Sequence, residues 1–222
     1  MRKRISMQTM VMIAFATTSV FVIIVMGIIF YIRLYRNQIN ENIIYSTGVI
    51  EQATNNMEDY LFRMRQISDT AYYNIIKESD ANDVNMQSKI NLLYEANRDS
   101  LKSIALYYQA GGLVLAEPVS EEKADVDVIS QEWFINALRR VENMHFSAPH
   151  VQNLFDDSTK KINWVVSLSR MVDITVDNRV RRGVLLVDMD YSALSEIIDQ
   201  INEMGSDTYY YLCDSAGNII YH

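Results

Sequence analysis

The chain has 222 residues, a formal net charge of −8 and a single cysteine, which excludes an internal disulfide framework. Its 20 Lys and Arg residues stand against 28 Asp and Glu residues, and five of the basic residues lie before residue 37, where no acid occurs. The remainder therefore carries 15 basic and 28 acidic side chains, a net charge of −13. That balance excludes nucleic acid as an expected partner, because nucleic-acid binding depends on Lys and Arg at the phosphates.

An apolar run from Met10 to Ile32 dominates the sequence, and no charged residue lies between Arg4 and Arg33. An α-helix rises about 1.5 Å per residue, so about 20 apolar residues cross a hydrocarbon core about 30 Å thick. The run is longer than the apolar core of a cleavable signal peptide, about 7–15 residues, and no small-x-small cleavage pattern follows it. The sequence therefore predicts an uncleaved transmembrane anchor over residues 10–32, in contact with membrane lipid.

Basic residues flank this run on both sides. Arg2, Lys3 and Arg4 precede it, and two arginines follow it. The positive-inside rule favours a cytoplasmic location for residues 1–9. We therefore predict a protein of the cell membrane with a single span in this segment, its N-terminus cytoplasmic and the remainder extracytoplasmic.

Residues 33–77 contain no proline and only one glycine, which predicts a long stalk helix continuing from the anchor. Over residues 57–71 its apolar seam fits either a partner helix or a sheet of the same domain. Over residues 38–53 nothing nearby in the sequence covers the seam, so we expect a homodimer through the stalk helix. The seam consists of residues at heptad spacing: Ile39, Ile43, Ser46, Ile50, Ala53, Met57, Tyr60, Met64, Ile67 and Ala71.

Downstream of the stalk the hydrophobic period changes repeatedly between 3.6 and 2, which indicates a mixture of helices and strands. In chain order we predict a turn at 79–83, a helix with Met86, Ile90, Leu93, Tyr94 and Asn97 on one face, a hairpin over 104–115 that turns at 110–112, a helix from an N-cap at Ser130 to Arg140, strands at 145–152, 162–172 and 181–188 joined by polar turns at 156–161 and 173–179, and a helix over 191–202 capped by Asp190.

Helices followed by a mostly antiparallel sheet indicate an α+β fold with the long helix laid across one face. The predicted module spans residues 78–204. Residues 208–221 then read as a hairpin with a turn at 214–218, and the chain stops in mid-strand at His222. Because an isolated hairpin is marginally stable at best, we expect residues 205–222 to be the start of a second, truncated module.

The sequence gives little support for a catalytic function. It has three histidines and seven glycines, and it lacks the His-Glu-x-x-His, Gly-x-Ser-x-Gly and phosphate-binding glycine patterns. Asp188 and Asp190 resemble a metal pair, but Asp190 is better explained as a helix cap. We therefore expect no catalytic residue, no metal site and no cofactor in these residues.

A small-ligand pocket has more support. Trp133 and Phe134 fall on a short helix beside the predicted sheet, while Arg170 and Asp188 each end an apolar strand. Aromatic walls with a few convergent polar groups are typical of such pockets. Two alternatives stay open: Trp133 as ordinary core, and Arg170 with Asp188 as a structural ion pair.

Several segments, in this order behind an anchor and a long helix, resemble the extracytoplasmic double-Cache sensor domain and the N-terminal part of a Gram-positive-type sensor histidine kinase. They are Gln131–Ala137, Phe146–His150, Trp164–Arg170, Gly183–Asp188 and Tyr211–Ile220. The resemblance covers residues 33–222. It implies two PAS-like modules on one long helix, of which this chain holds the membrane-distal module and the first hairpin of the proximal one.

The resemblance also implies a ligand site in the distal module, at Gln131, Trp133, Phe134, His150 and Asp188, and the strand-end argument above adds Arg170 to the predicted site. In the amino-acid-binding branch of the family, an Arg-x-Trp-Tyr run, a later Tyr and a strand-end Asp hold the ligand's carboxylate and amine. This chain keeps Trp133 and Asp188, but has Gln131 for the Arg, Phe134 for the first Tyr and His150 for the second. Without the Arg a carboxylate loses its bidentate partner, so a neutral solute such as a sugar, or a partner solute-binding protein, fits as well as an amino acid.

These observations predict a membrane-anchored extracytoplasmic sensor of a small ligand. As the resemblance implies, it would be the input part of a two-component histidine kinase that signals to a response regulator through domains absent from these residues. Rival hypotheses are a chemotaxis transducer with the same sensor, a membrane-tethered cyclase or phosphatase, and an anchored surface-interaction domain without signalling. The last predicts a filled pocket, and a cavity lined by Trp133 and Asp188 would count against it.

Overall fold

The computed structural model describes residues 6–119, 122–124, 126–139, 144–155, 162–204, 209–213, 217 and 219–221. The chain forms two compact units, Met1–Gln52 and Ala53–His222. The predicted cytoplasmic arginines, the turn at 156–161 and most of the turn at 214–218 lie outside the described residues.

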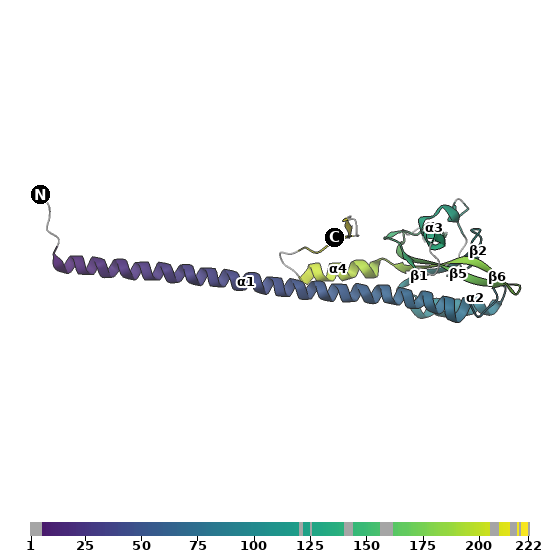
Figure 1. The fold of residues 1–222 in the computed structure, drawn as a ribbon, viewed down its shortest axis with the longest axis horizontal. Coiled ribbons are helices and arrows are strands. Elements are labelled where there is room, and N and C mark those ends of the chain that lie inside the picture. Colours follow the sequence, from purple (N-terminus) through teal and green to yellow (C-terminus); the bar gives the residue numbers. More distant parts are fainter. Residues whose placement is uncertain are drawn as a thin grey trace. The chain divides into compact units, whose positions relative to one another are not determined.

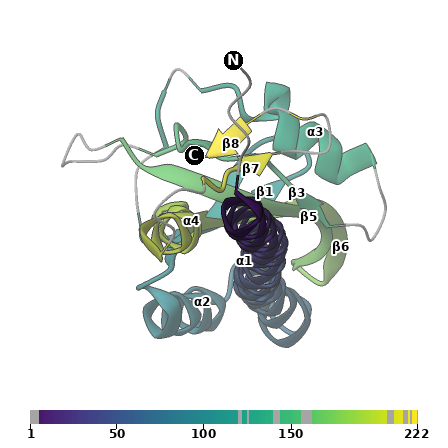
Figure 2. The same cartoon turned by 90° about the vertical axis from the view of Figure 1, so that its left-hand side faces the viewer.

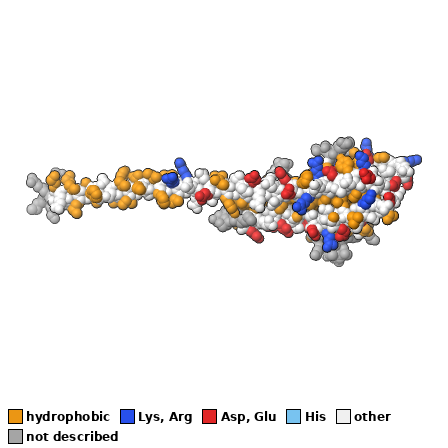
Figure 3. All heavy atoms as spheres, turned by 90° about the horizontal axis from the view of Figure 1, so that it is seen from below, with side chains coloured by type: hydrophobic (Ala, Val, Ile, Leu, Met, Phe, Trp, Pro, Cys, Tyr) orange, Lys and Arg blue, Asp and Glu red, His pale blue; other side chains and the backbone are white. Residues whose placement is uncertain are grey.

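The first unit consists of the N-terminal part of one α-helix, α1 (Met7–Asp69), drawn in purple and blue in Figure 1. Within the described part of the chain, this is the one helix long and apolar enough to cross a membrane. Its large apolar side chains between Met10 and Ile32 are exposed and colour this stretch of the surface orange in Figure 3. Length and composition thus agree with the predicted span.

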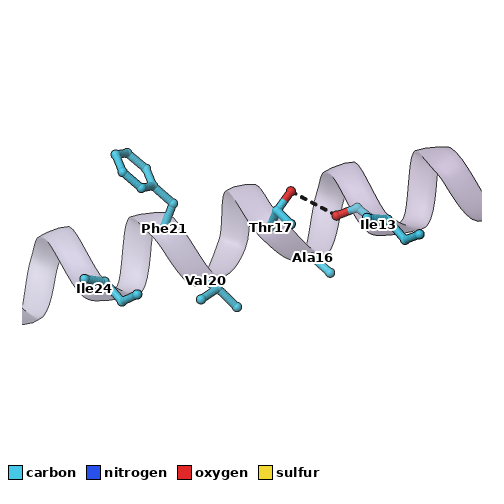
Figure 4. A pocket seen from close by; sticks show the side chains of 6 residues that line it. All are labelled: Ile13, Ala16, Thr17, Val20, Phe21 and Ile24. Carbon is cyan, nitrogen blue, oxygen red and sulfur yellow. Dashed lines mark hydrogen bonds between the residues drawn. The ribbon is translucent and has the colours of Figure 1, made fainter.

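Two threonines interrupt the apolar surface of α1 without leaving a free hydroxyl. The Thr17 hydroxyl donates to the Ile13 carbonyl at 3.0 Å, as Figure 4 shows, and the Thr18 hydroxyl donates to the Ala14 carbonyl at 3.0 Å. Such bonds satisfy the hydroxyls within the helix. The hollow drawn in Figure 4 is lined by side chains of this single helix, so we do not count it as a ligand site.

The predicted stalk helix is confirmed, but its last seven residues form a π-helix, η1 (Thr70–Ile76). In the second unit α1 packs on the sheet of its own domain, because Tyr60, Met64, Ile67 and Ala71 are buried in one cluster with the strands. This packing decides between the two alternatives for residues 57–71. Further upstream Ile39, Ile43 and Ile50 are exposed.

The second unit is built around an antiparallel sheet. Its path is β2-β1-β6-β5-β3, and β4 also pairs with β5. The predicted first hairpin is confirmed. The strands are β1 (Leu101–Tyr108), β2 (Leu113–Glu117), β3 (His145–Phe146), β4 (His150–Val151), β5 (Trp164–Val176) and β6 (Arg179–Asp190).

Helices cover both faces of this sheet (Figure 2). One face packs against the end of α1, against α2 (Val84–Asn97) and against α4 (Ser192–Met204). The other face packs against α3 (Glu132–Arg139) and the segment around Phe155. The predicted α+β class is therefore confirmed, with the long helix on one face of the sheet.

Of the two predicted helix caps, the one at Asp190 is confirmed and the one at Ser130 is wrong; a third cap, at Asp83, was not predicted. Asp83 caps α2 by accepting the Asn85 amide at 2.9 Å, and Asp190 accepts the Ser192 amide at the start of α4 at 2.9 Å. The predicted N-cap at Ser130 is wrong. Ser130 instead ends a 3-10 helix, η2 (Val128–Ser130), and α3 starts after Gln131, whose carbonyl accepts the first helical amides.

Two predicted strand boundaries are also corrected. The predicted turn at 173–179 shrinks to Asp177–Asn178, because β5 continues to Val176 with its alternate side chains still buried on the core. Both turn residues have positive φ, +50° and +59°, as a two-residue hairpin turn requires. The predicted strand at 145–152 divides into β3 and β4, because Pro149 lacks the amide needed to continue the pairing.

The C-terminal residues form the predicted hairpin, in which β7 (Leu212–Cys213) pairs antiparallel with β8 (Ile219–Tyr221). It is a separate two-stranded sheet. The Tyr221 hydroxyl donates to the Asp199 carboxylate of α4 at 2.7 Å. This hairpin is thereby tied to the last helix of the module.

Candidate ligand site

A cavity of about 700 Å³ opens on the α3 face of the sheet. Its walls are the start of α3, Gln131–Trp133, together with the segment 145–151 and Asn153. The β3 and β4 strands hold this segment against β5, with His145 opposite Ser169 and His150 opposite Val165. The interruption at Ser147–Pro149 therefore lies at the cavity wall.

Of the two aromatic residues predicted for the site, one lines the cavity and the other is buried in the core. Trp133 lines the cavity although only 5% of it is exposed, and its ring packs on Tyr107 at 5.7 Å and on Phe134 at 5.5 Å. Phe134 is fully buried in the core beneath α3. Trp133 is thus both core and cavity wall, whereas Phe134 supports it from behind.

A chain of hydrogen bonds joins the cavity wall to a buried carboxylate. The His150 Nδ1 atom bonds to the Ala148 carbonyl at 2.9 Å, and Nε2 lies 3.3 Å from the Ser167 hydroxyl. Ser167 donates to one oxygen of Asp188 at 2.5 Å, and Ser103 donates to the other at 2.7 Å. Asp188 is 1% exposed and does not line the cavity, and Ser167 connects it to the cavity-lining His150.

Burial sets the electrostatics of this carboxylate. Loss of hydration raises the pKa of Asp188 above its usual value, although the hydroxyls of Ser167 and Ser103 and the nearby His150 act to lower it. The two serines were not predicted as site residues. Their signal was a hydroxyl side chain on the cavity face of an otherwise apolar strand, which is common enough to be overlooked.

Arg170 lies on the opposite face of the sheet from the other five predicted site residues. Its guanidinium bonds to the Asp69 carboxylate at 2.6 Å and lies 4.9 Å from the ring of Tyr72 and 5.3 Å from that of Tyr73. Asp188 of β6 is paired with Ser167 of β5, and Ser167 lies three positions before Arg170 on the same strand. An odd offset places two strand residues on opposite faces, so Arg170 and Asp188 form no ion pair.

The described wall residues suit a ligand without negative charge. They include the exposed Glu132 and two histidines, His145 and His150, but no Lys or Arg. Gln131 stands at the start of α3, half exposed. Within the part of the chain that the structure describes, no three His, Cys, Asp or Glu side chains gather as a metal site.

An antiparallel sheet with a long helix on one face and a walled cavity on the other defines the PAS-like class of sensor folds. The family model for the Cache domain, dCache_1, matches residues 32–222. The chain therefore belongs to the Cache domain family. No match was found among curated protein sequences.

Similar solved structures are ligand-binding domains of bacterial chemoreceptors. The domain of the Pseudomonas aeruginosa PAO1 amino acid chemoreceptor PctC, in complex with GABA, is 20% identical, with a TM-score of 0.59 over 80% of this chain and 74% of that one. The domain of PctB from the same organism, in complex with L-Gln, is 18% identical, with a TM-score of 0.56 over 80% and 67%. The sensory domain of Campylobacter jejuni Tlp3 with isoleucine bound is 18% identical, with a TM-score of 0.53 over 79% and 68%. These likenesses establish the fold.

Asp188→Asn and Asp190→Asn are expected to change stability with opposite pH dependence. A carboxyl whose pKa is raised by folding makes its stabilising contribution below its unfolded pKa and loses it as the pH rises through the folded pKa. Hydrogen bonds from Lys102 and Ser192 outweigh burial and lower the pKa of Asp190, so its contribution is present above the unfolded pKa and is lost as the pH falls through the folded one.

The measurement is the melting temperature of each variant minus that of the wild type, between about pH 3 and about pH 8. The difference should rise with pH for Asp188→Asn and fall with pH for Asp190→Asn. Titration of groups that do not interact with Asp188 or Asp190 cancels in the differences. If the melting-temperature difference changed with pH in the same direction for both variants, the opposite pKa shifts of Asp188 and Asp190 would be contradicted.

Proposed function

We propose that this protein is a membrane-anchored, extracytoplasmic sensor of a small ligand. The observation that carries the proposal is the cavity walled by Trp133 and His150, with the Asp188 carboxylate held behind it. Its volume falls in the range of about 300–1,000 Å³ that is usual for ligand pockets. An interaction domain without a ligand predicts a filled pocket. The cavity is lined by Trp133 but not by Asp188, so it meets only half of the criterion set against that rival.

We infer that the ligand lacks a free carboxylate. The similar chemoreceptor domains were solved with GABA, L-Gln and isoleucine, each of which carries one. The described wall of this cavity contains no Lys or Arg to pair with such a group, and Gln131 stands where the amino-acid-binding pattern has Arg. A neutral solute fits the wall better, and a partner solute-binding protein is the alternative.

The ligand is expected to stabilise the chain through contacts with the His150 wall. We expect that a compound from a panel of sugars, polyols and amino acids raises the melting temperature of the chain in detergent micelles. His150→Ala should weaken the binding of that compound about tenfold or more, because it removes wall surface and disconnects Asp188.

Leu92→Ala is the matched control, because Leu92 is exposed on α2, on the other face of the sheet. It should leave the affinity unchanged, as measured by titration calorimetry. If a compound binds equally well to the wild type and to His150→Ala, its binding site lies outside this cavity.

Strand β5 offers a route from the cavity to the stalk. Ser167 and Ser169 bond on the cavity side, to Asp188 and to the Trp133 carbonyl, while Arg170 holds Asp69 at the end of α1. Ligand binding would bias two arrangements of this strand and helix, since a ligand shifts an equilibrium by its differential affinity. The helix would carry that bias toward the membrane.

The same helix is proposed to form a homodimer, because Ile39 and Ile43 are exposed at seam positions. Ile43→Cys, in a Cys213→Ser background, should form a disulfide-linked dimer readily under mild oxidation in membranes. Glu41→Cys is the control, because it lies about 200° around the helix from Ile43 and should cross-link much more slowly. Equal rates on non-reducing gels would count against this interface.

For the output we propose the input part of a sensor histidine kinase that signals to a response regulator. The chemoreceptor neighbours favour a chemotaxis transducer as the second candidate. The complete gene product in membranes, supplied with labelled ATP, should acquire an acid-labile and base-stable phosphoryl group if it is a kinase. Absence of label together with methylation of glutamates would identify a transducer.

A further inference from the structure

We propose that Asp188, Ser167 and His150 share one removable proton, and that loss of this proton to the outside medium releases the His150 wall of the cavity. Occupancy of the ligand site would then depend on the external pH. The inference rests on the proposed role of the cavity as a ligand site and adds a form of regulation to it. The three residues are called the proton relay below.

One nitrogen of the His150 ring bonds to a group that can only accept. Its Nδ1 atom lies 2.9 Å from the Ala148 carbonyl oxygen, and a carbonyl has no proton to donate. Nδ1 therefore carries a proton in this geometry. The protonation state of the ring then depends on its other nitrogen, Nε2, which lies 3.3 Å from the Ser167 hydroxyl oxygen.

The Ser167 hydroxyl has one hydrogen and lies between two groups that can take it, the Asp188 carboxylate and His150 Nε2. If the hydroxyl donates to an ionised Asp188, its contact with His150 is a hydrogen bond only when Nε2 also carries a proton. If Asp188 is protonated instead, it donates to Ser167, and Ser167 donates to the neutral ring. Both arrangements contain the same number of protons.

A proton can therefore move along the relay without a change in its net charge. The Nε2–H bond breaks as that proton passes to the Ser167 oxygen, and the Ser167 O–H bond breaks as its hydrogen passes to Asp188. Removing one proton altogether leaves an ionised carboxylate and a neutral ring that compete for a single hydrogen. The carboxylate is the stronger acceptor, so the hydrogen bond between Ser167 and His150 is lost.

Burial determines where the relay exchanges its proton with the medium. Asp188 is 1% exposed and Ser167 is fully buried, whereas His150 is half-buried and lines the cavity. Loss of hydration raises the pKa of Asp188, which favours retention of the proton within the relay. When the proton leaves, it passes to water at His150, and the segment 145–151 loses a side-chain bond to β5.

Two other titratable groups line the same cavity and face the relay. They are Glu132 at the start of α3 and His145 on β3, whose Nε2 atom lies 3.2 Å from the amide nitrogen of Asn136. Their titration has to be separated from that of the relay by experiment, and His145 provides a matched control.

The titratable groups on the sheet side of the relay have partners or keep their protons. Asp190, two residues after Asp188, is paired with Lys102 at 2.7 Å. Tyr60 of α1 and Tyr107 of β1 both interact with the Asp188 charge, and burial raises the pKa of each tyrosine. Neither tyrosine therefore changes its charge near neutral pH.

The first experiment compares melting temperatures of the ligand-free chain in detergent micelles between about pH 5 and about pH 9. His150→Gln keeps a nitrogen donor within reach of Ser167 at every pH, so it should retain the bond that the wild type loses. A bond that requires a proton stabilises the wild type at acid pH and stops doing so as the pH rises through the loss of that proton. The melting temperature of His150→Gln minus that of the wild type should therefore rise with pH.

His145→Gln is the matched control and should not reproduce this rise. Ser167→Ala and Asp188→Asn each interrupt the relay, so in either background His150→Gln should cause no pH-dependent difference, and two backgrounds keep the test decisive if one fails to fold. A rise of the same size in these backgrounds would mean that His150 titrates alone. That result, or a flat difference in the wild-type background, would overturn the proposal.

The second experiment is calorimetry with myo-inositol, D-glucose and glycerol, none of which ionises in this pH range. A probe that binds should bind the wild type at least about fivefold more weakly at the alkaline end, as expected for loss of one hydrogen bond, and its affinity for His150→Gln should change less than about twofold. A constant affinity for the wild type would overturn the regulatory role. If none of the three probes binds, the proposed sensing of a neutral solute is contradicted, whereas the melting temperatures still decide whether the relay exists.

Discussion

The alternation of side chains along β5 is the constraint on which the rest of this module depends. Residues at even positions from Val166 to Val176 face the end of α1, and the odd residues Ser167 and Ser169 face the cavity. Arg170 belongs to the first set, which is why it meets Asp69 and not the ligand site. One strand thereby bonds to both the cavity wall and the end of the long helix.

The buried Asp188 carboxylate is the second organising feature, because a charge removed from water needs hydrogen-bond donors. Ser103 and Ser167 provide them from the strands on either side of β6. Ser167 also contacts His150, so the geometry of the cavity wall is coupled to the carboxylate beneath it. The site is therefore supported by the sheet itself and not only by the segment 145–151.

Much of the secondary structure was predictable from periodicity and caps. The helix after Asp83, the hairpin around Gly111 and Gly112 and the helix after Asp190 were placed correctly, because each has a clear hydrophobic period next to a local turn or cap signal. The errors have two causes, a competing local cap and a distant packing contact. Ser130 has the chemistry of an N-cap, but Asp127 caps a 3-10 turn first. The polar residues after Val172 read as a turn, yet Ile174 and Val176 continue the strand because the core on the α1 face extends that far.

The sequence by itself determined the apolar run, the long helix and the α+β order of elements, because these follow from composition and hydrophobic period. Only the tertiary structure decided that residues 57–71 pack on their own sheet, that Asp188 lies behind Ser167 and that Arg170 joins Asp69. The physical reason is that strand register sets which face a side chain occupies, and register depends on pairing between residues far apart in the chain.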